Sequence, residues 1–216
     1  MASEVDISNL ALSLLGERAE VIAIAPSDGS AEAQLCGRFY PMARDEMLEM
    51  HPWTFAMRRV SMAQVTNDRP SWAYAYQIPA DCLKPRAVLM NEACDDAVSD
   101  DFIVETSDTG TKVLYTNTPE ATLRYTRAVT DTTRFTPMFS AALGRLMASK
   151  MAGAIIKGAE GMQVSQAHTK LFFVEFAAAK ADDSNTGSRA NQFRDFVPSA
   201  MRARGAVSRF DRERRQ

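Results

Sequence analysis

The chain has 216 residues, of which 46% are hydrophobic and 24% are charged. This composition is typical of a folded globular protein and excludes a disordered or fibrous chain. The three cysteines, Cys36, Cys82 and Cys94, form no Cys-x-x-Cys pair, which argues against a disulfide framework and favours a reducing compartment. There is neither a basic leader before an apolar run nor a stretch of about 18 apolar residues, so we expect a protein made in the cytoplasm that does not enter a membrane.

Charge is distributed unevenly along the chain. Residues 187–216 contain eight arginines and three acidic residues, which gives this segment a net charge of +5. Residues 1–186 contain 17 basic and 24 acidic residues, a net charge of -7. The sequence therefore predicts an acidic body followed by a cationic C-terminal arm.

The first 52 residues predict two helices. Ser3 can cap the first helix, and Gly16 can end it in a left-handed conformation. Apolar residues recur between them at intervals of three and four: Ile7, Leu10, Ala11, Leu14 and Leu15. The second helix is expected from about residue 31 to residue 50, with a bend at Pro41 and an end at His51-Pro52. Its apolar stripe consists of Cys36, Tyr40, Ala43, Met47 and Met50.

Short strands are expected between about residues 53 and 133. Six segments are rich in β-forming residues or alternate between apolar and polar positions: 55–65, 72–78, 86–90, 102–106, 112–116 and 121–129. Asp108-Thr109-Gly110 lies between two of them and is typical of a hairpin turn. This region predicts a small antiparallel β domain inserted between helices.

Two further helices are expected after the strands. Thr136 and Pro137 are typical of a helix start, and this helix should end near residue 157. The last helix, about 162–181, has a coiled-coil-like apolar seam: Val164, Ala167, Leu171, Val174, Ala178 and Ala181. Three phenylalanines add a second apolar surface, and one helix pair cannot easily bury both. Either the first two helices or a neighbouring subunit covers the excess. The residues that we assign to a subunit interface are Leu171, Phe172, Phe173, Val174 and Phe176.

The expected fold class is α+β, with a bundle of about four helices, an inserted antiparallel β domain and an extended C-terminal tail. We place the helical domain at residues 1–52 and 134–184, the β domain at 53–133, and the arginine-rich arm at 185–216. The arm lacks apolar periodicity, so we expect it to be flexible until it docks on a partner.

The sequence gives little support for catalysis. His51 and His168 fall in different elements, and neither has a cysteine or an acidic residue at a metal-ligand spacing. We expect His51 to pack at a helix end and His168 to lie at a surface or an interface. The acidic pairs 95–96, 100–101 and 182–183 lack an EF-hand pattern and are interpreted as solvated charge. Phosphate-binding glycine loops and Gly-x-Ser-x-Gly elbows are absent. We therefore expect no enzyme activity, no cofactor and no metal site.

Aromatic residues gather between residues 53 and 76. Trp53, Phe55, Trp72, Tyr74 and Tyr76 could stack on sugars or bases, but few basic residues are interleaved with them. A core at the joint between helices and β domain is the favoured interpretation, because such side chains contribute most to core packing.

The arginine-rich arm has three interpretations: a solvated terminus, a nucleic-acid-binding arm, or a docking segment for an acidic protein surface. Its arginines are separated by aromatic residues, Val197 and Pro198, which suits a groove on a protein at least as well as a nucleic acid. Arginine is also enriched at protein interfaces, where it pairs with carboxylates through two hydrogen bonds.

Several stretches resemble the tail tubular protein A family of short-tailed bacteriophages. The most specific is 39–59, in which a proline-containing helix runs into His51-Pro52-Trp53; the second is 72–83, Trp-Ala-Tyr-Ala-Tyr-Gln-Ile-Pro-Ala-Asp-Cys-Leu. Further similarity lies in 113–118, 129–134 and 141–158, and the resemblance covers roughly residues 3 to 195.

The resemblance implies a virion protein that forms a twelvefold ring, the head-to-tail adaptor between the portal and the tail nozzle. It implies a helical bundle with a β-sandwich-like insertion and a lumen through which genomic DNA passes without specific binding. It also implies that the C-terminal arm faces the portal. The portal-docking residues expected on this basis are Phe193, Arg194, Phe196, Arg202, Arg204, Arg209, Phe210 and Arg212.

Two other functions remain open from the sequence. One is a nucleic-acid-binding packaging or assembly factor that uses the arginine-rich arm, and a steep dependence of binding on salt would distinguish it. The other is a hydrolase, which would require a pocket that unites His51 with an acid and a nucleophile.

Overall fold

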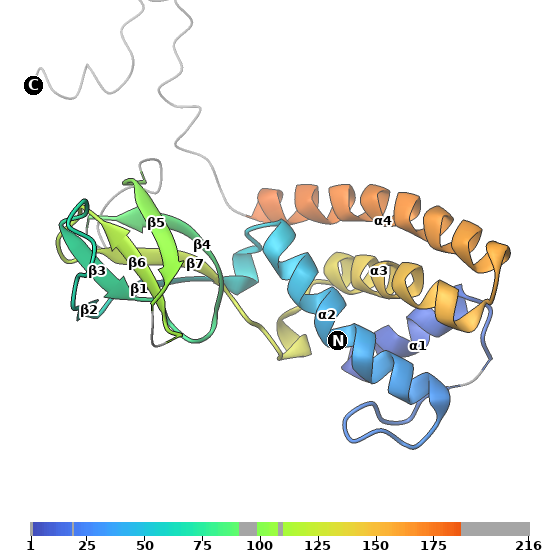
Figure 1. The fold of residues 1–216 in the computed structure, drawn as a ribbon. Helices are drawn as coiled ribbons and strands as arrows, with labels where there is room; N and C mark the ends of the chain where they lie inside the picture. The colour runs from blue at the N-terminus through green and yellow to red at the C-terminus, as the bar shows by residue number, and fades with distance from the viewer. Residues whose placement is uncertain (1, 19, 91–98, 108–109, 187–216) are drawn as a thin grey trace, which may run out of the picture.

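The computed structural model describes residues 2–18, 20–90, 99–107 and 110–186. Within these residues it contains four α-helices and two small antiparallel sheets, which confirms the α+β class (Figure 1). The helices are α1 (Glu4–Leu14), α2 (Ala31–Met50), α3 (Pro137–Ile155) and α4 (Ala159–Thr186). The strands are β1 (Met57–Ser61), β2 (Gln64–Val65), β3 (Tyr74–Gln77), β4 (Cys82–Leu89), β5 (Phe102–Thr106), β6 (Lys112–Thr116) and β7 (Thr122–Arg127). Two short 3-10 helices, η1 (Thr54–Ala56) and η2 (Thr132–Arg134), flank the strand region.

Local signals set the helix starts. The side chains of Ser3, Ser30 and Thr136 each accept a hydrogen bond from a backbone N–H three residues further on, which satisfies a donor that the helix leaves open. Gly16 has a φ of +82°, the left-handed conformation expected after α1. Pro41 lies inside α2, which continues through it to Met50.

Helix α3 is the centre of the bundle. It packs against α1, α2 and α4, and its buried residues lie on all of its sides, including Phe139, Leu143, Met147 and Met151. The apolar core around it includes side chains from all four helices. In α2 the predicted stripe is confirmed for Cys36, Tyr40, Ala43 and Met47, but Met50 in the last turn is exposed.

The strands form two antiparallel sheets with the orders β1-β7-β4 and β2-β3-β6-β5. One apolar cluster draws on both sheets: Tyr76 and Leu114 come from the second sheet, and Val88, Leu123 and Tyr125 come from the first. The sheets thus share a core, as expected of a sandwich-like unit. The predicted hairpin joins β5 to β6, in which Phe102 pairs with Thr116 and Thr106 with Lys112.

Polar contacts join the first sheet to the end of α2. The Arg86 Nε donates to Thr126 Oγ1 at 2.8 Å, and its Nη2 donates to the backbone oxygen of Glu49 at 2.9 Å. Lys84 Nζ lies 3.5 Å from the same oxygen. The last carbonyl groups of a helix have no partner within it and carry its negative dipole end, so two cations stabilise this end.

The largest departures from the predicted segment boundaries concern the first strand segment, β4 and α4. The expected strand 55–65 is divided into η1, β1 and β2, and β4 begins at Cys82 instead of residue 86. Helix α4 runs from Ala159 to Thr186, beyond the expected 162–181. Its last turn includes Asp183, which contacts residues far away in the sequence, and such contacts extend a helix beyond its local pattern.

Candidate interaction surfaces

Within the described residues, one flank of α4 is apolar and exposed. Five of the six residues of the predicted seam lie on it and define the α4 stripe: Ala167, Leu171, Val174, Ala178 and Ala181. The sixth, Val164, packs partly against the core of its own chain. Leu171 and Val174 are 49% and 68% exposed. At 1.5 Å per residue these fifteen positions span about 20 Å along the outer edge of the bundle (Figure 1). A helix of a single folded chain normally turns its apolar stripe inward, so this stripe is a candidate contact surface.

The five residues assigned to a subunit interface separate into two groups. Phe172 and Phe176 are buried in the core of their own chain, where Phe176 packs edge-on against Trp53 with ring centroids 5.9 Å apart. Leu171 and Val174 belong to the α4 stripe, and Phe173, 55% exposed, lies on the other flank of the helix. The structure therefore leaves three of the five side chains accessible to a partner.

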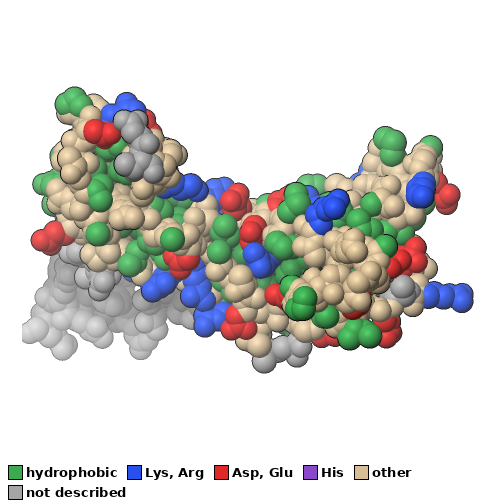
Figure 2. Space-filling model, turned by 60° about the horizontal axis from the view of Figure 1, so that its bottom comes forward, with side chains coloured by type: hydrophobic (Ala, Val, Ile, Leu, Met, Phe, Trp, Pro, Cys, Tyr) green, Lys and Arg blue, Asp and Glu red, His purple; other side chains and the backbone are tan. Residues whose placement is uncertain are grey.

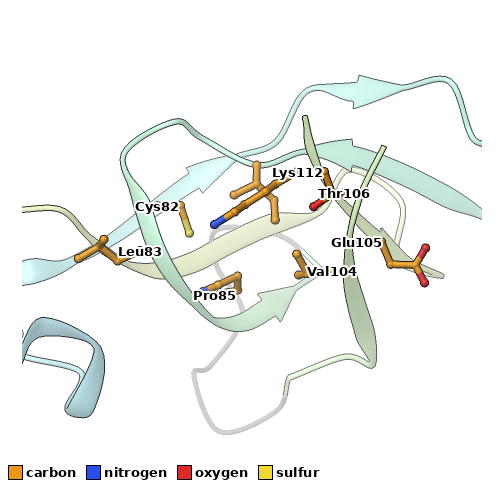
Figure 3. Close-up of a pocket in the computed structure, with 8 residues that line it drawn as sticks. Cys82, Leu83, Pro85, Val104, Glu105, Thr106 and Lys112 are labelled. Atoms are coloured by element: carbon orange, nitrogen blue, oxygen red, sulfur yellow. The ribbon is translucent and has the colours of Figure 1, made fainter. Parts of the chain in front are cut away.

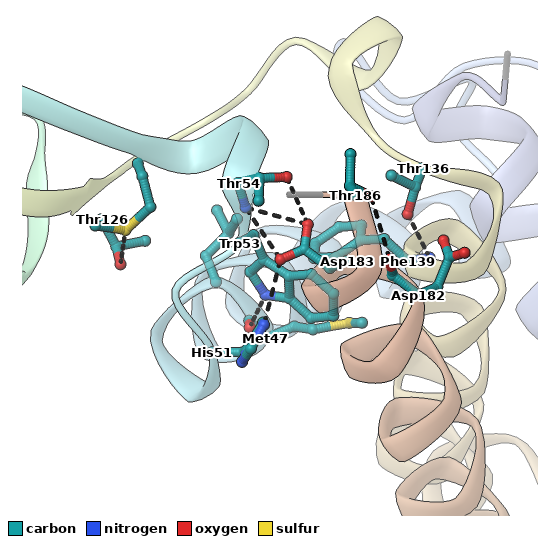
Figure 4. Close-up of polar contacts among 12 residues, drawn as sticks. Met47, His51, Trp53, Thr54, Thr126, Thr136, Phe139, Asp182, Asp183 and Thr186 are labelled. Atoms are coloured by element: carbon teal, nitrogen blue, oxygen red, sulfur yellow. Dashed lines mark hydrogen bonds and ion pairs between the residues drawn. The ribbon is translucent and has the colours of Figure 1, made fainter. Parts of the chain in front are cut away.

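A polar cluster around the buried Asp183, the Asp183 junction of His51, Thr54 and Asp183, ties the end of α4 to the start of the strand region (Figure 4). Asp183 is 2% exposed, so the interpretation of this acid as solvated charge is wrong. Its carboxylate accepts from Thr54 Oγ1 at 2.6 Å and from Thr54 N at 3.1 Å. His51 Nε2 lies 3.3 Å from Asp183 Oδ2. Buried carboxylates need such donors, because burial without them is costly.

His51 contacts the Asp183 carboxylate through its Nε2. Burial lowers the pKa of His51, and the opposing effect of the Asp183 carboxylate is smaller. A carboxylate only accepts hydrogen bonds, so Nε2 is the nitrogen that donates to Asp183, and the ring packs edge-on against Trp53 with centroids 4.8 Å apart. The expectation that His51 packs at a helix end is confirmed, since it is the C-cap residue of α2.

His168 was expected at a surface or an interface, but it is buried within its own chain, so the surface position is wrong. It lies on the side of α4 that faces α3, where Arg145 Nη1 is 3.3 Å from its Nδ1. Arg145 also donates through Nε to Glu175 Oε1 at 3.0 Å. Burial, followed by the charge of Arg145, lowers the pKa of His168. The group joins two helices of one chain and does not present the histidine to solvent.

A small hollow lies between β4 and the β5–β6 hairpin. Its volume is about 220 Å³, and Cys82, Pro85, Val104 and Lys112 are among the residues that line it (Figure 3). Burial raises the pKa of the Cys82 thiol to about 11. A thiol in this state is a poor nucleophile, because the thiolate is the reactive form. Cys36 is likewise free and buried.

The remaining sequence predictions concern metal sites, membrane spans, the two histidines and the portal-docking residues. The part of the chain that the structure describes contains no cluster of three or more metal-ligating side chains, and none of its helices is both long and apolar enough to span a membrane. His51 and His168 contact different partners and do not form one site. The predicted portal-docking residues, Phe193 to Arg212, lie outside the described residues.

The aromatic residues between positions 53 and 76 do not share one core. Trp53 is fully buried at the joint, against Phe139 and Phe176, as expected for a core residue. The interpretation as a core at the joint is wrong for Tyr76, which is buried in the shared core of the two sheets, where its hydroxyl donates to the Thr118 oxygen at 2.9 Å.

Comparison of the sequence with protein-family models and with curated proteins finds no match.

Proposed function

We propose that this chain is a structural head-to-tail adaptor, similar to tail tubular protein A, that joins the portal of a short-tailed phage to the tail nozzle. Copies of the chain form a ring, twelvefold by the resemblance, around the path of the genomic DNA. Its role is geometric: it closes the portal vertex and offers a platform to the nozzle. It works in the virion, at the connection of head and tail, after assembly in the host cytoplasm.

The observation that carries this proposal is the α4 stripe. Five apolar residues face outward along one flank, although Phe172, Phe176 and Ala179 of the same helix are buried in the core. A second copy of the chain could bury this stripe, since an apolar surface gains roughly 25 cal/mol for each Å² removed from water. In a ring, the stripe would contact a different surface of the next copy, because such contacts are head-to-tail.

The charge distribution supports the other two contacts of the proposal. The +5 segment from residue 187 onward begins directly after the last turn of α4, which the Asp183 junction holds in place. An arm that starts from a fixed position can reach an acidic surface on the portal. The net charge of -7 on residues 1–186 suits a conduit whose walls repel DNA phosphates.

Charge on the α4 stripe should prevent assembly. We expect the double variant Leu171→Glu/Val174→Glu to weaken self-association at least tenfold, because each carboxylate would have to lose its water in the contact. Sedimentation of the protein, alone and mixed with its portal, measures this. The matched control is Gln166→Glu/Ala177→Glu, which adds the same charge to exposed positions of α4 outside the stripe. Equal assembly of the two double variants would contradict the proposal.

A further inference from the structure

The hollow between β4 and the β5–β6 hairpin has an apolar lining from several strands. Figure 2 shows exposed hydrophobic side chains scattered over the strand region and the helices, and single residues of this kind do not mark a binding site. The hollow differs from them because it has a volume of about 220 Å³. A cavity of about 150 Å³ can hold benzene, so the hollow has room for a phenyl ring. Its lining includes Ile78, Cys82, Leu83, Pro85, Val104 and Lys112.

The hollow lies between two strand edges. The sheet orders place β4 and β5 each at the end of its sheet, with no further strand beside it among the described residues. One hydrogen bond joins the two edges, from Asp100 N to Val88 O at 2.9 Å. The hollow lies further along both strands, beside Cys82 at the start of β4 and Thr106 at the end of β5. A strand edge of this kind exposes backbone groups that can accept another strand.

Backbone groups of β5 point to this edge. Ser107 N donates to Thr111 O at 2.9 Å, so the backbone of Ser107 faces β6. Because this direction alternates along an antiparallel pair, Glu105 also faces β6, whereas Val104 and Thr106 face the free edge. The Val104 side chain, 40% exposed, lines the hollow, and Figure 3 shows the Glu105 side chain pointing away from it. An added segment would gain hydrogen bonds here and place alternate side chains in the hollow.

Lys112 supplies the charge of the site. Its side chain extends across the hollow toward Cys82 (Figure 3). None of the ion pairs between described residues includes Lys112, and Glu105 is paired with Arg69. An acid on the added segment could therefore pair with this ammonium group. Since alternate residues of an extended segment share one side, the fitting sequence has a large apolar residue and an acid two positions apart.

Residues 193–197 of this chain, Phe-Arg-Asp-Phe-Val, have this pattern. Of the three phenylalanines in residues 187–216, only Phe193 has an acid two positions away, which is Asp195. We propose that the free edge of β5 and the hollow bind residues 193–197 of the same chain, with Phe193 in the hollow and Asp195 beside Lys112. Arg194 then lies on the side of Glu105, so both charges of the segment meet an opposite charge.

The segment is within reach of the hollow. Helix α4 ends beside the strand region, where the Asp183 junction holds it (Figure 1). Leu83 lines the hollow and also packs against the helical core, to which α4 contributes. The seven positions from Thr186 to Phe193 can span about 25 Å when extended. Because a short tether gives an effective concentration in the millimolar range, the segment of the same chain is favoured over that of another copy.

This inference goes beyond the proposed function and does not depend on it. It gives Phe193 and Arg194 a partner in their own chain, in place of the portal that the resemblance implies. The arginines from Arg202 onward remain for the portal. None of the residues that line the hollow lies on α4, so the ring contact and this site can be tested separately.

The first test measures amide hydrogen exchange in the full chain. If residues 193–197 occupy the edge, the Val104 and Thr106 amides of the wild type should exchange roughly tenfold more slowly than those of Phe193→Asp. The Glu105 amide faces β6 and should exchange equally in both, which shows that the variant is folded. Met201→Asp removes an apolar side chain outside the segment and is the matched control, which should behave as the wild type.

The second test exchanges the two charges. Asp195→Lys should speed exchange of the Val104 amide, because it places a second cation beside Lys112. The double variant Lys112→Asp/Asp195→Lys restores an opposite pair and should recover most of the protection. Two unrelated losses would add and would not recover, so recovery identifies a direct contact.

Three results would overturn the proposal. The first is equal exchange of the Val104 amide in the wild type and in Phe193→Asp, which would leave the edge without this segment. The second is a double charge variant that recovers nothing, which would exclude the pair of Lys112 and Asp195. The third is protection that falls when the protein is diluted, which would assign the bound segment to another copy of the chain.

Discussion

Replacing Asp183 with alanine is expected to lower the free energy of unfolding by about 3 kcal/mol. The change leaves the Thr54 N–H and hydroxyl and the His51 Nε2–H without their acceptor. A hydrogen bond to a charged group contributes roughly 1.5–3 kcal/mol. The loss is smaller at Thr54, because this residue is exposed and water can replace the carboxylate. For a chain of this length the melting temperature should fall by roughly 6–12 °C. Thermal unfolding followed by circular dichroism measures the effect.

The neighbouring acid provides a matched control. Asp182 is exposed in the same helical turn, so Asp182→Ala should change stability by less than about 0.5 kcal/mol. Both carboxylates lie near the C-terminal end of α4, where the helix dipole disfavours negative charge. A difference between the two substitutions would therefore come from the contacts of Asp183 and not from a preference of the helix for an acid. Equal effects of the two substitutions would show that the contacts of Asp183 contribute nothing.

Replacing Trp53 with alanine should destabilise the protein by about 4 kcal/mol, the range found for large aromatic residues removed from a core. Trp53 is fully buried, and its ring contacts those of His51, Phe139 and Phe176. Its Nε1 donates to the Met47 oxygen at 2.8 Å (Figure 4). The substitution would open a cavity and would also leave the Met47 oxygen near the end of α2 without its donor. Denaturant unfolding should show a lower midpoint.

Trp72 is the second tryptophan of the chain and serves as the control. It is only partly buried, beside the outer cluster of the second sheet. We expect Trp72→Ala to cost about 1 kcal/mol, within the ordinary range of single substitutions. If both alanine variants lost the same stability, Trp53 would not be the centre of the joint.

Patterns with local causes predicted much of the fold. Ser3, Gly16 and Thr136 mark helix ends through contacts with residues close in sequence, and the bounds of α2 agree with those expected from its apolar stripe and from His51-Pro52. The apolar spacing also identified the α4 stripe. It could not show that the stripe faces outward while Phe172 and Phe176 face the core, because that depends on how α3 and α4 pack.

The polar groups that the sequence missed depend on contacts between distant residues. Asp183 and Thr54 are 129 positions apart in the sequence. Because Asp183 follows another aspartate, Asp182, the sequence alone indicates a pair of solvated charges. Arg59 and Arg124 become neighbours only through the register of β1 and β7, which short strands do not reveal. His168 has a polar partner on α3 that permits its burial, and nothing near it in the sequence indicates this.

The central claim is that copies of this chain assemble with one another and on a portal. Electron microscopy of the full chain, mixed with the portal proposed as its partner, tests it most directly, and a chain ending at residue 186 serves as the comparison. The account predicts a closed ring on the portal vertex with the α4 stripe buried between adjacent copies, and no stable complex when residues 187–216 are removed. Particles of a single 23.8 kDa chain that ignore the portal, or a shortened chain that binds it as well as the full one, would contradict the account.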